Sequence, residues 1–214
     1  MTDVERTVVF LDLTRFTALT DIHGDETAAD IIDRFVAAVQ TEVDGRGRLV
    51  KTLGDGVLLD ISDPAVAIEV ADRINHRLHR ETGMPEVTGG ITTGTVIERG
   101  RDILGTTVNL AARLADLAPA GELRTTEQAA RAAASAGWRV EPLGPTDIRG
   151  FHESISIFAV RLCHPEDCTT DPVCGMRLTP GDDTPQIDHD GVARWFCSAP
   201  CLERFRSAPG RYLA

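Results

Sequence analysis

Apolar residues recur along this chain with two different periods, and these periods predict its helices and strands. Residues 25–43 and 64–81 carry apolar side chains at helical spacing, which predicts two amphipathic helices. Residues 5–13 and 87–98 are short apolar runs rich in β-branched residues, which predict strands. The other expected elements are a helix starting at Thr14, a turn over 99–105, a helix from there to Leu117, an alanine-rich helix over 125–136, and strands over 138–143 and 154–161.

Residues 50–59, which read VKTLGDGVLL, predict a β-hairpin at the centre of the fold. Gly54 and Gly56 flank Asp55 at its tip, and glycine suits a tight turn with positive φ. An acid is common in turns, so Asp55 could be a simple turn residue. Lys51 favours a functional site, because it is the one lysine in a chain whose other 21 basic residues are arginines. A compact ammonium group is therefore wanted there, and a planar guanidinium is not.

The order of these elements predicts an α+β fold with ferredoxin-like elements, in which helices cover one face of a mainly antiparallel sheet. The composition changes after Leu162, so we expect a first domain over residues 1–162, a polar linker over 163–171 and a small module over 172–214. All five cysteines lie beyond residue 162. With no export signal on the chain, they predict metal or redox chemistry rather than disulfides. A bound metal would help so short a module to fold.

The net charge of −11 on 214 residues narrows the expected function. Nucleic acid and anionic membranes would repel such a chain, so neither is an expected partner. A ferredoxin-like sheet can bind RNA, but this needs basic charge and exposed aromatic side chains, and only 5% of the residues are aromatic. The chain has no apolar run of about 18 residues and no signal-peptide pattern, which predicts a cytoplasmic protein.

Two acids are placed where a cation site is expected. Asp12 ends a buried strand, where a carboxylate is costly unless it is paired or binds a cation, although it could also start a turn before Thr14. Asp55 lies on the tip of the predicted hairpin. If their strands are neighbours, the two carboxylates can share a pair of Mg²⁺ or Mn²⁺ ions that bridge phosphate groups.

Four further polar residues fit a nucleotide. Lys51 and Asp102 offer a donor and an acceptor, which match N1 and N6 of adenine, whereas guanine presents the opposite pattern. Asn109 and Arg113 are four residues apart and share one helix face. There, Asn109 could orient a ribose oxygen and Arg113 could neutralise a pentavalent phosphorane. A structural Asn–Arg surface pair would look the same.

Several segments together resemble the class III adenylate/guanylate cyclase catalytic domain. FLDLTRFT, KTLGDG and DILGTTVNLAARL occur in the family's order, and DIRGFHESISIFAV resembles its closing segment, so the likeness covers residues 7–160. It implies that ATP is converted to 3′,5′-cyclic AMP and pyrophosphate by attack of the 3′-hydroxyl on the α-phosphate. In the family's pattern the metal-binding groups would be Asp12, Asp55 and the Leu13 carbonyl, the adenine-selecting residues Lys51 and Asp102, and the transition-state residues Asn109 and Arg113.

The resemblance also implies a head-to-tail homodimer with two sites across its interface, each holding two Mg²⁺ or Mn²⁺ ions. Asp12 and Asp55 of one chain would face the other four residues of its partner. The sequence departs from the family at two positions. Arg15 stands where a glycine is usual on the loop beneath the triphosphate, and Phe151 lies near the place of a phosphate-binding lysine, for which Arg149 is a candidate substitute.

The C-terminal residues resemble a YHS domain, a small metal-binding type of module. Cys174, Cys197 and Cys201 are expected to hold Zn²⁺ or another soft metal. The fourth ligand stays open among Cys163, His164, Cys168 and His189, and the thiols could instead be buried apolar groups. Regulation of the cyclase by this module is a hypothesis. The alternative function is a weakly active or inactive nucleotide-binding signalling protein whose tail senses metal or redox state.

Overall fold

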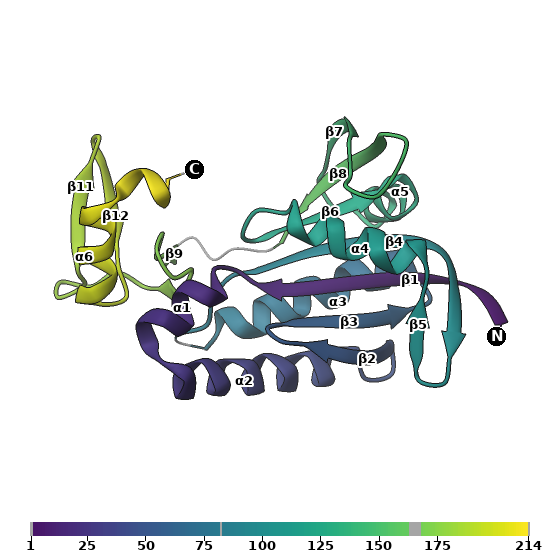
Figure 1. The fold of residues 1–214 in the computed structure, drawn as a ribbon, viewed down its shortest axis with the longest axis horizontal. Helices are drawn as coiled ribbons and strands as arrows, with labels where there is room; N and C mark the ends of the chain where they lie inside the picture. Colours follow the sequence, from purple (N-terminus) through teal and green to yellow (C-terminus); the bar gives the residue numbers. More distant parts are fainter. Residues whose placement is uncertain (1, 82, 163–167, 214) are drawn as a thin grey trace.

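One large sheet organises most of the chain (Figure 1). The computed structural model describes residues 2–81, 83–162 and 168–213. Within them, eight strands form this sheet in the order β2-β3-β1-β4-β6-β8-β7, and the short β5 pairs with β4. The pairs are antiparallel except for β4 and β6. The strands are β1 (Thr2–Leu13), β2 (Gly47–Leu53), β3 (Gly56–Ile61), β4 (Val87–Arg99), β5 (Asp102–Leu104), β6 (Glu122–Thr126), β7 (Val140–Thr146) and β8 (Ile155–Arg161).

The helices lie on both faces of this sheet, whereas the sequence predicted them on one. Along β1, Val9 and Leu11 pack into the larger apolar core with α2, α3 and α5, whereas Val8 packs on the opposite face with Ala111 of α4. This explains why β1 reads as a continuous apolar run, since both of its faces are covered. The helices of this part are α1 (Phe16–His23), α2 (Asp25–Val43), α3 (Pro64–His79), α4 (Thr106–Asp116) and α5 (Glu127–Ser135).

Glycine lets α4 approach the sheet closely. A Cβ added at Gly90 of β4 would lie 1.9 Å from the carbonyl oxygen of Ala111 in α4. Only a residue without a side chain fits between this strand and this helix. The position of α4, which carries Asn109 and Arg113, therefore depends on Gly90.

Two strands of the large sheet were not predicted from the sequence. The expected turn over 99–105 contains β5, which continues from β4 as a hairpin. The expected helix over 125–136 is preceded by β6, and α5 begins only at Glu127. The helix of residues 25–43 is α2 with the predicted bounds.

The C-terminal segment, residues 168–213, packs against α1 (Figure 1). Phe16 and Ile22 of α1 belong to the same apolar core as Cys174, Phe196 and Phe205 of this segment. Residues 163–167 of the expected linker lie outside the described residues, and regular structure resumes with β9, within the range expected as linker. The elements of the segment are β9 (Thr169–Thr170), β10 (Arg177–Leu178), β11 (Gln186–His189), β12 (Val192–Trp195), α6 (Ala199–Ser207) and the 3₁₀ turn η1 (Pro209–Arg211).

Backbone hydrogen bonds also join the C-terminal segment to the loop before β4. The Arg177 N–H donates to the Met84 carbonyl at 3.0 Å, and the Glu86 N–H donates to the Gly175 carbonyl at 3.2 Å. The Glu86 carbonyl in turn accepts from the Thr14 N–H at 2.9 Å. These bonds connect the segment to the turn that follows β1. No helix in the described part of the chain combines the length and apolarity needed to cross a membrane.

Candidate functional site

The two candidate metal-binding acids lie side by side at one end of the sheet. In the antiparallel pairing of β1 with β3, Asp12 is opposite Gly56, the residue directly after Asp55. Its Oδ1 lies 3.1 Å from where a Cβ on Gly56 would be, so glycine leaves room for this carboxylate. Burial, and then the negative charge of Asp55, raise the pKa of Asp12 to about 6. A carboxylate that is destabilised by burial and by a second carboxylate fits a site for a hard divalent cation.

The turn after Asp12 has an unusual backbone. Leu13 ends β1, and its N–H hydrogen-bonds to the Asp12 carboxylate, which opposes the rise in the pKa of Asp12. Arg15 has φ of 56°, in the left-handed region that favours glycine. A non-glycine residue in this conformation costs about 1 kcal/mol. The backbone therefore keeps the shape of a glycine turn although the sequence has arginine there.

Lys51 and Asp102, far apart in sequence, form a direct ion pair. The Lys51 Nζ lies 2.8 Å from both carboxylate oxygens of Asp102, and one of these oxygens also accepts from the Ile103 N–H at 2.9 Å. The hydrogen bond from Lys51 lowers the pKa of Asp102. Both side chains are more than one-third exposed, at 36% and 40%, so a ligand can reach them.

Lys51 and Asp102 meet because β5 lies beside β2. Arg48 of β2 supports this arrangement, since its guanidinium donates to the Arg101 carbonyl at 2.6 Å, just before β5. The sequence analysis paired Lys51 with Asp102 on chemical grounds, and the structure places them in contact.

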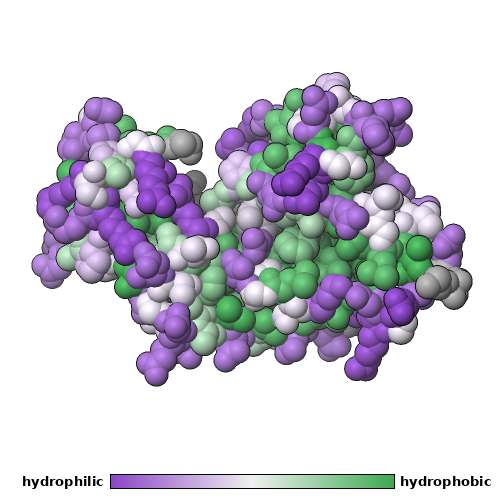
Figure 2. Space-filling view, in the orientation of Figure 1, coloured by the Kyte–Doolittle hydropathy of each residue, from purple (hydrophilic) through white to green (hydrophobic). Residues whose placement is uncertain are grey.

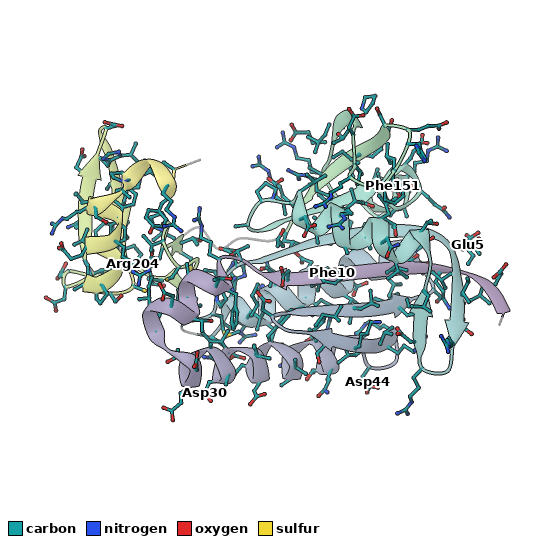
Figure 3. All side chains as sticks on the ribbon, viewed as in Figure 1. Glu5, Phe10, Asp30, Asp44, Phe151 and Arg204 are labelled. Carbon is teal, nitrogen blue, oxygen red and sulfur yellow. The ribbon has the colours of Figure 1, made fainter. Side chains whose placement is uncertain are left out.

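Asn109 and Arg113 face a pocket of about 590 Å³ beside α4. Arg149 and Phe151, the two residues noted for the missing phosphate-binding lysine, line the same pocket. Arg113 also pairs with Asp116 at 3.1 Å on the exposed side of the helix. Phe151 lies on the loop above α4 (Figure 3). The pocket therefore offers two guanidinium groups to an anion. Its lining is Thr106, Asn109, Ala112, Arg113, Arg149, Gly150, Phe151 and His152.

The pocket beside α4 is lined by two of the six polar residues and not by the other four. The six residues form three groups: the Asp12–Asp55 pair, the Lys51–Asp102 pair, and the pocket at Asn109 and Arg113. Among the described residues that line this pocket, none belongs to either of the other two groups.

Three cysteines of the C-terminal segment meet one histidine of α1. The Cys197 sulfur lies 3.5 Å from that of Cys174, 3.6 Å from that of Cys201, and 3.5 Å from the His23 Nε2. All four candidate ligand atoms lie within 4.8 Å of one another. The three cysteines that the sequence groups as candidate ligands lie together in the structure. His23 was not among the predicted ligands, because nothing in the primary sequence links it to them.

The other candidates for a fourth ligand are elsewhere or outside the described residues. The Cys168 sulfur contacts the Thr179 hydroxyl at 3.9 Å. The His189 ring packs on Phe205, and its Nε2 lies 3.6 Å from Asp190. Cys163 and His164 fall in the part of the chain that the structure does not describe.

Known proteins resemble this chain in sequence and in fold. The adenylate cyclase of Streptomyces coelicolor is 42% identical over 120 residues, which are 56% of this chain and 32% of that protein. The adenylyl cyclase CyaB from P. aeruginosa superposes with a TM-score of 0.65 at 21% identity, over 78% of this chain and 99% of that one. This chain has the cyclase fold. The guanylyl cyclase Cya2 is similar to the same degree, with a TM-score of 0.64 at 20% identity over 78% of this chain and 96% of that one.

The sequence relatives are longer than this chain. It spans about a third of the length of the curated adenylate cyclases that it matches. No protein-family model matches the chain, so the resemblance of the C-terminal segment to a YHS domain has no support from that comparison.

Proposed function

We propose that this protein is an adenylate cyclase, which converts ATP to 3′,5′-cyclic AMP and pyrophosphate at sites formed between two copies of the chain. The observation that carries the proposal is the Asp12–Asp55 pair at the end of β1, found on the cyclase fold together with the Lys51–Asp102 pair. Relatives named adenylate cyclase support the same activity.

Asp12 and Asp55 bind the catalytic cations in this proposal, with the Leu13 carbonyl as a further oxygen ligand. When bound, two Mg²⁺ or Mn²⁺ ions supply a lower pKa for the ribose 3′-hydroxyl and positive charge beside the α-phosphate. The ligand set fits such ions, because it consists of oxygen atoms and because burial and the charge of Asp55 make the ionised Asp12 carboxylate unfavourable without a cation.

Lys51 and Asp102 select the base. On binding, the ammonium group donates to N1 of adenine and the carboxylate accepts from N6. Their mutual ion pair holds both groups in place before the nucleotide arrives. With guanine the hydrogen-bond donors and acceptors are reversed, so neither Lys51 nor Asp102 would find its complementary partner on the base. This mismatch is strongly unfavourable.

Asn109 and Arg113 act on the reacting phosphate. Asn109 orients the ribose, and Arg113 stabilises the negative charge that develops on the α-phosphate in the transition state. Arg149 lies in the same pocket and binds a phosphate oxygen of the triphosphate, in place of the lysine of other cyclases.

A second copy of the chain completes each site. In the proposed dimer the nucleotide lies between Asp12 and Asp55 of one copy and the other four residues of its partner, and the pocket lining of a single chain, which includes only Asn109 and Arg113 of the six, is consistent with this. Apolar surface is visible over the region of β1, β2 and β3 (Figure 2). Leu53 and Leu104, in the strands that carry Lys51 and Asp102, are 45% and 40% exposed. Such surface is typical of an interface.

Lys51→Glu tests the base-selecting role. The variant should lose at least about 100-fold in kcat/KM for ATP, since glutamate cannot donate to adenine N1. Arg131→Glu makes the same charge change on the exposed face of α5 and should keep the wild-type preference. The measurement is turnover of ATP and GTP with Mn²⁺ by both variants and the wild type. Wild-type turnover that is absent with ATP would refute the cyclase and favour a nucleotide-binding signalling protein. Unchanged ATP turnover in Lys51→Glu would refute the role of this pair alone.

A further inference from the structure

We propose that Cys174, Cys197, Cys201 and His23 together bind one Zn²⁺ ion, which fastens the C-terminal segment to helix α1. Three ligands come from the C-terminal segment and the fourth from the end of the first helix of the cyclase fold. The site therefore belongs to neither part alone.

The distances match the edges of a tetrahedral zinc site. Zinc–sulfur bonds of about 2.3 Å place neighbouring sulfurs about 3.8 Å apart, and a zinc–nitrogen bond of about 2.0 Å gives a sulfur–nitrogen edge of about 3.5 Å. The Cys197 sulfur lies 3.5 and 3.6 Å from the other two sulfurs and 3.5 Å from the His23 Nε2. A disulfide needs a separation of about 2.05 Å, so these cysteines are positioned as separate ligands.

Asp171 holds two of the ligand-bearing segments in position. Its side chain is fully buried, and one oxygen accepts from the Val173 N–H at 2.8 Å while the other accepts from the Cys197 N–H at 2.8 Å. A carboxylate that bonds the backbone beside metal ligands is the usual outer support of a metal site. Cys201 lies in the first turn of α6, where the helix dipole favours a thiolate.

His23 connects this metal site to the candidate catalytic loop. It is the last residue of α1, and α1 begins directly after the turn at Thr14 and Arg15 that follows Asp12. The C-terminal segment also touches this turn: a Cβ on Gly175 would lie 2.7 Å from the Thr14 carbonyl oxygen, and the Arg15 guanidinium reaches the Tyr212 carbonyl at 3.5 Å. Metal binding therefore fixes the segment against both ends of α1.

Arg204 adds a second contact on the same side. It lies on α6 (Figure 3) and forms an ion pair with Asp21 of α1 at 2.5 Å. Because both side chains are well exposed, this pair orients the surfaces without supplying much affinity. The metal is the stronger fastening.

The test measures metal binding by the purified 214-residue chain without nucleotide. We expect one zinc per chain by elemental analysis, and a Co²⁺-loaded protein with the intense visible bands of a tetrahedral site. His23→Ala should weaken Zn²⁺ binding by more than about 100-fold in chelator competition, since loss of an outer support alone costs 10–100-fold. His189→Ala, a matched control in β11 of the C-terminal segment, should bind like the wild type.

His23→Cys tests whether a loss of zinc in His23→Ala comes from misfolding and not from the missing ligand. It should keep one zinc per chain and strengthen the sulfur-to-cobalt absorption, because a fourth thiolate replaces the imidazole. Equal affinity in wild type and His23→Ala would overturn the assignment of His23. A wild type that binds no zinc, or that oxidises to a disulfide under the same conditions, would overturn the site.

One consequence rests on the proposed cyclase function. Removing the zinc with a zinc-selective chelator in excess Mg²⁺ should lower the cyclase rate by about fivefold or more, a typical coupling between two sites. His23→Ala should show the lower rate with and without chelator, and His189→Ala should behave like the wild type. Equal cyclase rates of the wild type with and without the chelator would refute the coupling. The zinc content is measured without ATP, so it tests the metal site even if the protein has no cyclase activity.

Discussion

Asp12→Asn is expected to abolish ATP cyclisation and, at the same time, to make the metal-free protein more stable at pH 8. The first effect follows because asparagine lacks the negative charge with which Asp12 binds the cations. This loss should reduce kcat by at least about 1,000-fold. The second follows because burial and the nearby charge of Asp55 raise the pKa of Asp12 to about 6, so its ionised form is unfavourable in the folded chain.

The stability effect has a defined pH dependence. The pKa of Asp12 is about 6 in the folded chain and 3.8 in the unfolded chain, so the folded chain holds the proton more tightly. Wild-type stability therefore falls as the pH rises from about 4 through 6. The full cost is at most about 3 kcal/mol and is reached above pH 7. Asp12→Asn removes this cost, so its gain should be largest at pH 8 and roughly half as large at pH 5.

Urea unfolding with excess chelator at the two pH values measures this gain. Asp30→Asn makes the same substitution on the exposed face of α2 and should change stability by less than about 0.5 kcal/mol at either pH. An Asp12→Asn variant that is less stable than wild type at pH 8 would contradict the electrostatic account of this site. One that retains cyclase activity would contradict the cation-binding role.

Arg113→Ala is expected to lower kcat by about 100- to 1,000-fold with little change in KM, because the guanidinium acts on charge that develops only in the transition state. Asp116→Asn provides the comparison, since it removes the ion pair at 3.1 Å but keeps Arg113. If Arg113 served only this surface pair, both variants would lose the same small amount, at most about 1 kcal/mol of stability, and kcat would not separate them. Steady-state kinetics at saturating Mn²⁺ distinguish the two outcomes.

Elements that depend on local periodicity were predictable from the sequence. The apolar spacing of residues 25–43 gave α2 with its observed bounds, and the Gly-Asp-Gly tip gave the β2–β3 hairpin. The three-residue β5 and the strand β6 were missed because pairing with β4, more than their own residue pattern, decides their conformation. The prediction that α4 packs on the same face of the sheet as the other helices was wrong. Helical periodicity shows that one face of a helix is buried, but not against which face of a sheet it packs.

In the candidate site, too, some residues could be predicted from the sequence and others could not. Asp12 stands out in the sequence because an acid ends an apolar strand, and Asp55 because it lies on a hairpin tip that follows the one lysine. The sheet register places Asp12 opposite the residue after Asp55. His23 carries no such mark, since a single histidine at the end of an amphipathic helix resembles any surface residue. Only the packing of α1 against the C-terminal segment reveals its place beside the three cysteines.

Mixed dimers test the central claim, that each site is shared between two chains. Asp12→Asn and Arg113→Ala chains, co-expressed with different tags and purified by both tags, should form dimers with one intact site and one doubly damaged site. We expect about half of the wild-type rate per dimer, although each variant alone is nearly inactive. Mixed dimers that stay as inactive as the single variants would contradict a shared site.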